Sequence, residues 1–116
     1  MSVEWLRAYA ERLRREIREE EKRILEKQQK IRLAEAQIRY AENNAWLARR
    51  AGDYVMEQRY LSYVPRLRSK IAWLRQEIAR EQARLDQLAA MLRSVENRLS
   101  LEVAGRLGRV YKRTAR

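Results

Sequence analysis

The 116-residue chain contains no cysteine and no histidine, and it has only three glycines and one proline. Without cysteine or histidine there is no ordinary zinc site, thiol nucleophile, histidine base or disulfide framework, and the Glu-x-x-His motif of di-metal carboxylate bundles is absent. The best remaining pair of acids, Glu16 and Glu20, has the spacing of neighbours on an ordinary helix surface. The sequence therefore predicts a protein that is not an enzyme and that has no metal centre and no cofactor.

Long apolar stretches are absent as well. The longest segments without charge, such as Asn43 to Ala48 and Gln87 to Leu92, fall far short of the ~20 residues that a membrane-spanning helix needs. The N-terminus lacks a basic region followed by an apolar run, so no secretory signal is expected. These features predict a cytoplasmic location and no membrane partner.

Apolar residues recur at spacings of three and four, the pattern of an amphipathic helix. Ser2 is expected to cap a first helix over residues 3–51, and Gly52 to end it. One core position of this helix repeats every seven residues and carries Ala10, Ile17, Ile24, Ile31, Ile38 and Ala45.

A second series of the same kind predicts a helix over residues 54–104, with Asp53 as its cap. A turn at Gly52-Asp53 then joins two long helices into an antiparallel all-α hairpin over residues 1–104, a coiled coil that can assemble into a larger bundle or filament. The core positions of the second helix carry Leu67, Ile71, Leu74, Ile78, Leu85, Leu88, Leu92, Val95 and Leu99.

Three residues interrupt or limit the second helix. Proline removes one backbone hydrogen bond, so we expect a kink in a continuous helix near Pro65; a new helix that starts at Pro65 is the alternative. Gly105 and Gly108 are expected to end the helix, which leaves residues 105–116 as a basic C-terminal tail.

The turn predicts which core residues face each other, because paired residue numbers in an antiparallel hairpin have a constant sum. A tight turn at residues 52 and 53 sets that sum near 105 and places Leu6 opposite Leu99 and Leu13 opposite Leu92. In this register three flanking pairs have opposite charges: Arg14 with Glu96, Glu35 with Arg75, and Glu42 with Arg68.

Polar residues interrupt the core positions at Glu20, Lys27 and Glu81. In the predicted register Lys27 lies within a helical turn of Glu81, so these two side chains can pair. We interpret them as a polar layer that fixes the register of the helices rather than as a buried site.

The first helix has a second apolar face, which we call the outer stripe: Leu33, Tyr40 and Leu47, with Trp46 beside them. It lies about 200° around the helix from the main core positions. Because a two-helix hairpin covers one face only, we predict that the outer stripe is an oligomer interface with a second copy or a related subunit. A different partner protein, or residues 54–64 folded over the stripe, are the alternatives.

The charge balance points to a polyanionic partner. Lysine and arginine outnumber aspartate and glutamate by 27 to 16, a net charge of +11, and 22 of the cations are arginine. Residues 105–116 hold five cations and no acid, and arginine matches phosphate geometry. The tail therefore predicts nucleic-acid binding without sequence specificity, and a disordered solubilising end is the alternative. Its cations are Arg106, Arg109, Lys112, Arg113 and Arg116.

A basic, arginine-rich, all-helical chain of this size, with no cysteine and long helices joined at Gly52-Asp53, resembles the coat proteins of filamentous viruses of hyperthermophilic archaea. In that family, helical capsid subunits wrap double-stranded DNA. The resemblance implies a capsid or nucleocapsid protein in a virion of a thermophile. It also implies that the tail and the helix faces bearing further arginines line the DNA: Arg49, Arg50, Arg66 and Arg68.

The sequence is also similar to the hairpin stalk proteins of flagellar and type III export systems, which are arginine-rich antiparallel coiled coils. The similarity lies in Tyr60 and Tyr63 near the start of the second helix and in the stretch Leu92 to Lys112. It implies a protein-interaction hairpin instead of a nucleic-acid-coating protein. The chain is short for that family, whose pattern includes neither the outer stripe nor the basic tail.

Overall fold

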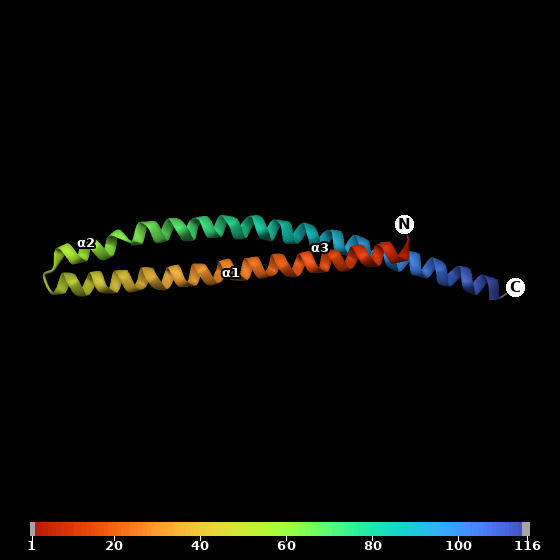
Figure 1. Ribbon diagram of the computed structural model, residues 1–116, viewed down its shortest axis with the longest axis horizontal. Helices are drawn as coiled ribbons and strands as arrows, with labels where there is room; N and C mark the ends of the chain where they lie inside the picture. The colour runs from red at the N-terminus through yellow and green to blue at the C-terminus, as the bar shows by residue number, and fades with distance from the viewer. Residues whose placement is uncertain (1, 115–116) are drawn as a thin grey trace. The chain divides into compact units, whose positions relative to one another are not determined.

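The computed structural model describes the backbone of residues 2–114 and the side chains of residues 2–109. It is all-α, as the sequence predicts: helices α1 (Val3–Arg50), α2 (Tyr54–Ser62) and α3 (Val64–Thr114) follow one another, with no strand among these residues (Figure 1). Ser2 caps α1 as expected, because its Oγ accepts a hydrogen bond from the backbone N–H of Trp5 at 3.0 Å. The composition explains the long helices, since it offers few residues that break one.

The turn between α1 and α2 is formed by the residues that the sequence singled out. Gly52 has a φ of 76°, a left-handed conformation that favours glycine. The N–H of Gly52 donates to the carbonyl of Arg49 at 3.0 Å, and that of Asp53 to the carbonyl of Ala48 at 2.9 Å, the two bonds of a Schellman motif. The Asp53 side chain then caps α2 by accepting from the N–H of Met56 at 3.1 Å.

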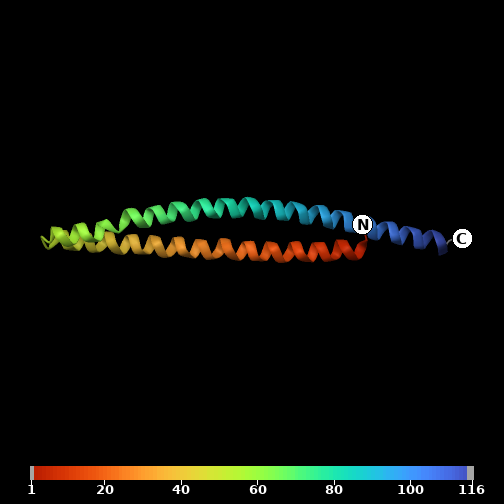
Figure 2. The same cartoon turned by 45° about the horizontal axis from the view of Figure 1, so that its top comes forward.

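A one-residue interruption at Tyr63 separates α2 from α3, close to the predicted kink. The Tyr63 N–H donates to the carbonyl of Tyr60 at 3.3 Å, a bond that spans three residues where an α-helical bond spans four. The N–H of Leu67 donates to the carbonyl of Tyr63 at 3.2 Å, with the four-residue spacing of an α-helix. Pro65 lacks the N–H that a regular helix would direct at the carbonyl of Leu61. The second long helix is thus bent near Pro65, as expected, and the bend divides it into α2 and α3, whose offset is visible in Figure 2.

The prediction that Gly105 and Gly108 end the second helix is wrong, because α3 continues through both to Thr114. A glycine ends a helix by adopting a positive φ, and among the described residues Gly52 alone does so. Helical glycine costs about 1 kcal/mol relative to alanine, and the arginine and leucine residues between the glycines favour a helix. The basic end of the chain is thus helical as far as Thr114.

The chain divides into two compact units, and each has its own core. Unit 1 consists of Met1–Lys22 and Ala83–Arg116, and unit 2 of Arg23–Gln82. The core of unit 1 is formed by Leu6, Ala10, Leu13, Leu88 and Val95, with Tyr9, Ile17, Leu92 and Leu99 packed against them. The core of unit 2 is formed by Ile31, Ala34, Ile71 and Leu74, with Ile38, Leu67 and Ile78 packed against them.

Both cores contain residues whose numbers sum to 105, in agreement with the predicted register. Leu6 and Leu99 share the cluster of unit 1, and Ile31 and Leu74 share that of unit 2. Within unit 2, α1 lies beside α2 and the first part of α3, and the two sides run in opposite directions from the turn (Figures 1 and 2). The seven-residue apolar repeat is therefore buried within each unit.

The ion pairs beside the core differ from those predicted. Arg14 pairs with Glu11 of its own helix at 2.9 Å. Solvated arginine side chains find a carboxylate on the next turn as readily as one on the facing helix, because exposed ion pairs are weak. Among the described residues the three predicted pairs do not form: Arg14 with Glu96, Glu35 with Arg75, and Glu42 with Arg68.

Candidate functional site

The two units have similar net positive charges but distribute them differently along the chain. Unit 2 contains 13 basic and 7 acidic residues, a net charge of +6. Unit 1 contains 14 basic and 9 acidic residues, and its whole excess of +5 lies in residues 105–116. The sequence prediction emphasised these last residues, but unit 2 carries at least as much uncompensated charge. A polyanion would therefore be attracted to unit 2 and to the end of α3.

Arg49 and Arg50, in the last turn of α1, both have partners. The Nε of Arg49 lies 3.8 Å from a carboxylate oxygen of Glu57 in α2. The guanidinium carbon of Arg50 lies 4.8 Å from the centre of the Trp46 ring, a cation–π contact that leaves the charge itself uncompensated. A phosphate at Arg49 would therefore compete with the carboxylate of Glu57, whereas one at Arg50 would have no such competitor among the described residues.

Arg66 and Arg68 lie in the first turns of α3, and both side chains are exposed. In the described part of the chain no ion pair joins either of them to a carboxylate. An exposed guanidinium without an internal acid keeps its full charge and all its donors for an external anion. These two residues are therefore the strongest of the predicted phosphate-binding positions in unit 2.

At the other predicted basic site, Arg106 is held by an acid of α1. Its Nη1 lies 3.4 Å from Oε1 of Glu4. A hydrogen bond from the backbone N–H of Glu4, and then the Arg106 guanidinium, hold the pKa of the Glu4 carboxyl below its ordinary value of 4.5. Arg109 is exposed. The side chains of Lys112 and Arg113, and all of Arg116, lie outside the described residues.

The outer stripe is exposed to solvent. Its side chains keep between 49% and 68% of their surface accessible, so residues 54–64 do not cover it. On α3, Trp73 is exposed to a similar degree, at 56%. Large apolar side chains in such a row favour contact with another surface. The residues of the outer stripe are Leu33, Tyr40, Trp46 and Leu47.

Unit 2 also has a groove that the sequence did not predict, with a volume of about 300 Å³. We call it the tyrosine groove, because α1, α2 and the link to α3 each supply one tyrosine ring to its wall. The signal was present in the sequence, because aromatic residues concentrate near the turn, but the groove forms only where α1 meets the segment around Tyr60 and Tyr63. Its lining residues are Gln37, Tyr40, Ala41, Tyr60, Tyr63, Arg66 and Leu67.

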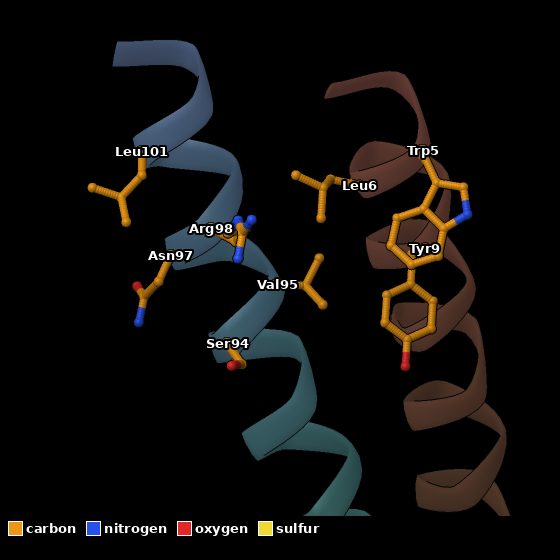
Figure 3. A pocket seen from close by; sticks show the side chains of 8 residues that line it. All are labelled: Trp5, Leu6, Tyr9, Ser94, Val95, Asn97, Arg98 and Leu101. Carbon is orange, nitrogen blue, oxygen red and sulfur yellow. The ribbon is translucent and has the colours of Figure 1, made fainter. Parts of the chain in front are cut away.

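Unit 1 has a second groove, of about 340 Å³, between α1 and α3 (Figure 3). Trp5 and Tyr9 of α1 stack with ring centres 5.2 Å apart. In Figure 3, Leu6 and Val95 point toward each other between the helices and form the floor. Arg98, at the groove, is paired with Glu102 at 3.6 Å, so the groove offers no free charge of its own.

The polar residues at core positions are paired: Lys27 with Glu81 as the sequence predicted, and Glu20 with a residue that the sequence did not single out. Lys27 donates a hydrogen bond to Glu81 and lies 3.8 Å from a carboxylate oxygen of Glu77. In unit 1, the Nε of Arg84 lies 3.8 Å from Oε2 of Glu20, whose side chain is almost fully buried. Opposite charges that neutralise one another inside a helix interface specify its register, so these residues serve the fold.

Other kinds of site are not found in the described residues. No group of three or more acidic side chains there is arranged to hold a metal ion. No helix in that part of the chain is both long and apolar enough to cross a membrane. Comparisons with protein-family models, curated proteins and solved structures found no match to this chain.

Proposed function

We propose that the protein is a structural nucleic-acid-coating protein that binds the phosphate backbone without sequence specificity and self-assembles. The observation that carries the proposal is the charge of unit 2, which has 13 cations and 7 acids, and in which the exposed guanidinium groups of Arg66 and Arg68 have no carboxylate partner among the described residues. Surplus arginine of this kind suits phosphate, which it binds through paired N–H donors. The end of α3, with Arg109 exposed, is a second contact region in this proposal.

The proposal includes one antiparallel hairpin over both units. It is supported by the common sum of 105 for residue pairs that share a core cluster in each unit, because one register continued through the chain gives that result. A hairpin of this kind buries one face of α1 and leaves the outer stripe free. Copies of the chain that pack through the outer stripe would then form a bundle or filament along the nucleic acid.

The salt dependence of binding tests this function. Each neutralised phosphate of a duplex contributes about 0.9 to the slope of log affinity against log salt concentration, so we expect a negative slope of several units for the wild type. A double variant, Arg66→Gln with Arg68→Gln, should reduce that slope by about 1.8. A flat dependence, or no binding to duplex DNA or RNA at low salt, would overturn the proposal.

A matched control removes the same charge from arginines that already have partners. Arg12 pairs with Glu16 at 3.4 Å and Arg80 with Glu77 at 3.0 Å, each on its own helix. The double variant Arg12→Gln with Arg80→Gln should change the slope by clearly less than the first one. If the two double variants lose the same amount, net charge rather than the surface around Arg66 determines binding.

A second candidate is a protein-interaction hairpin of a flagellar or type III export apparatus. The helical continuation of α3 past Gly105 favours it, because Leu101 and Leu107 are 71% and 65% exposed on a basic helix. Such an amphipathic segment suits a groove on another protein. Capture of an export ATPase by the purified chain, together with the absence of salt-dependent nucleic-acid binding, would favour this function over the first.

A further inference from the structure

The tyrosine groove is unlike the rest of the surface of unit 2, because three aromatic rings from separate elements surround one small space. Tyr40 comes from α1, Tyr60 from α2, and Tyr63 from the link before α3. The lining also includes the buried Ala41 and Leu67, which packs against the core of unit 2. Tyr60 and Tyr63 are three residues apart, so they lie on one face of the chain and toward Tyr40 of α1.

The lining defines the chemistry of a ligand. It contains no carboxylate, and its only charge is the guanidinium of Arg66, which forms no ion pair with any described residue. Gln37 adds an amide that can both donate and accept hydrogen bonds. Tyrosine rings beside an arginine form the usual platform for a stacked base and its phosphate. The volume of about 300 Å³ is at the lower end for ligand sites, which suits one flat ring system better than a helix.

We infer that the tyrosine groove binds an unpaired nucleobase, with the adjacent phosphate on Arg66. This inference rests on the proposed function and goes beyond it, because phosphate contacts alone do not recognise the bases. A second copy of the chain is a poorer occupant of the groove, since it would bring the same excess of positive charge to Arg66, and the contact between copies can form at Leu33 and Leu47, which lie outside the groove. An acidic peptide would neutralise Arg66, but its carboxylates would not stack on the three tyrosine rings.

The test compares two single strands that have the same phosphates. One is a polythymidylate of about 15 nucleotides, and the other is an abasic strand of equal length, each measured by fluorescence anisotropy at one salt concentration. Base stacking contributes about 1–3 kcal/mol, so the wild type should prefer the strand with bases by about 5- to 150-fold. Tyr60→Leu and Tyr63→Leu, which lie outside the outer stripe, should each reduce that preference while leaving the affinity for the abasic strand unchanged.

Two controls isolate the groove. Tyr54→Leu changes a tyrosine that is 64% exposed but does not line the groove, and it should keep the preference for bases. Leu47→Ser changes the outer stripe outside the groove, and it should keep the preference even if self-association weakens. Circular dichroism of each variant establishes that the helices are intact.

The outcomes separate the two proposals. Equal affinity for both strands would overturn the base site and leave the proposed function in place, whereas binding of neither strand or duplex would overturn both. A preference for bases that survives Tyr60→Leu and Tyr63→Leu would also overturn the site. If a glutamate-rich peptide with one phenylalanine binds, and Tyr63→Leu abolishes that binding while base preference is absent, the groove binds an acidic protein segment instead.

Discussion

At the scale of single residues, charged side chains in this protein have two roles that burial distinguishes. Lys27 and Glu81 are largely buried and form an ion pair, although Oε2 of Glu81 has no hydrogen-bond partner among the described residues. In unit 1 the buried Glu20 pairs with Arg84, whose side chain is exposed. Removing one partner of such a pair leaves a charge without compensation, which is more harmful than replacing both. Exposed residues such as Arg66 have no internal partner among the described residues and are therefore available to a ligand.

The Glu4 carboxyl provides a pH-dependent test at this scale. Its pKa is lowered by the backbone N–H and then by Arg106, so the folded state favours the carboxylate. Its stabilising contribution is present above the ordinary pKa of 4.5 and is lost as the pH falls through the lowered value. In an NMR titration, Arg106→Ala should raise the pKa of Glu4 part of the way toward 4.5, because the backbone hydrogen bond remains.

Arg7→Ala is the matched control, since Arg7 acts on Glu4 by charge alone and is the smallest of the influences on its pKa. We expect a smaller rise than for Arg106→Ala. An unchanged Glu4 titration in Arg106→Ala would contradict the contact between α1 and the end of α3 in unit 1.

At the scale of helices and turns, glycine acts in opposite ways at two positions. Gly52 has a φ of 76°, a conformation that strains any residue with a Cβ. Gly108 lies in α3, and a Cβ added there would meet nothing within 4 Å. The same substitution therefore separates a glycine that the turn requires from one that the helix only tolerates.

Gly52→Ala should lower the free energy of unfolding by about 1–2 kcal/mol, because the Cβ of alanine is strained in a left-handed backbone conformation. Gly108→Ala should instead increase helicity, with a local gain of up to about 1 kcal/mol. Denaturant unfolding measures the stability of the first variant. Far-ultraviolet circular dichroism, which reports helix content, measures the second. A gain in stability for Gly52→Ala would be inconsistent with the turn described above.

Much of this level of structure was predictable from the sequence. The two apolar series predict the long helices, and Ser2, Gly52 and Asp53 predict their caps, because each depends on neighbours within a few residues. The helical state of Gly105 was not predictable in this way, since the same residue type ends one helix and continues another. The tyrosine groove was also missed, because it depends on which residues of α1 meet those of α2 and α3 and not on the spacing of residues in one helix.

At the scale of the whole molecule, function depends on surfaces that the two cores leave exposed. Each unit buries its own apolar cluster, yet the outer stripe on α1 remains accessible. Unit 2 combines that stripe with a net charge of +6. In the function that we propose, the outer stripe contacts neighbouring copies and the excess arginine contacts the nucleic acid.

Self-association is the prediction at this scale. Wild-type protein should sediment as an oligomer, and Leu33→Glu with Leu47→Glu should yield a monomer with unchanged helicity, because charges placed in an apolar contact oppose it. Leu25→Glu is the control, since Leu25 is 50% exposed and lies outside the outer stripe. A folded wild-type monomer at high protein concentration would rule out this interface.

The end of α3 has one further consequence. Leu99 is the last apolar residue of α3 in the core cluster of unit 1, and the next core positions carry Glu102, Arg106 and Arg109. Residues 103–109 are thus held mainly by the hydrogen bonds of their own helix, so little free energy is needed to open them. Their amide hydrogens should exchange with solvent well before those of Leu13 or Leu74. Binding of a polyanion to this segment should slow the exchange of these amide hydrogens with solvent.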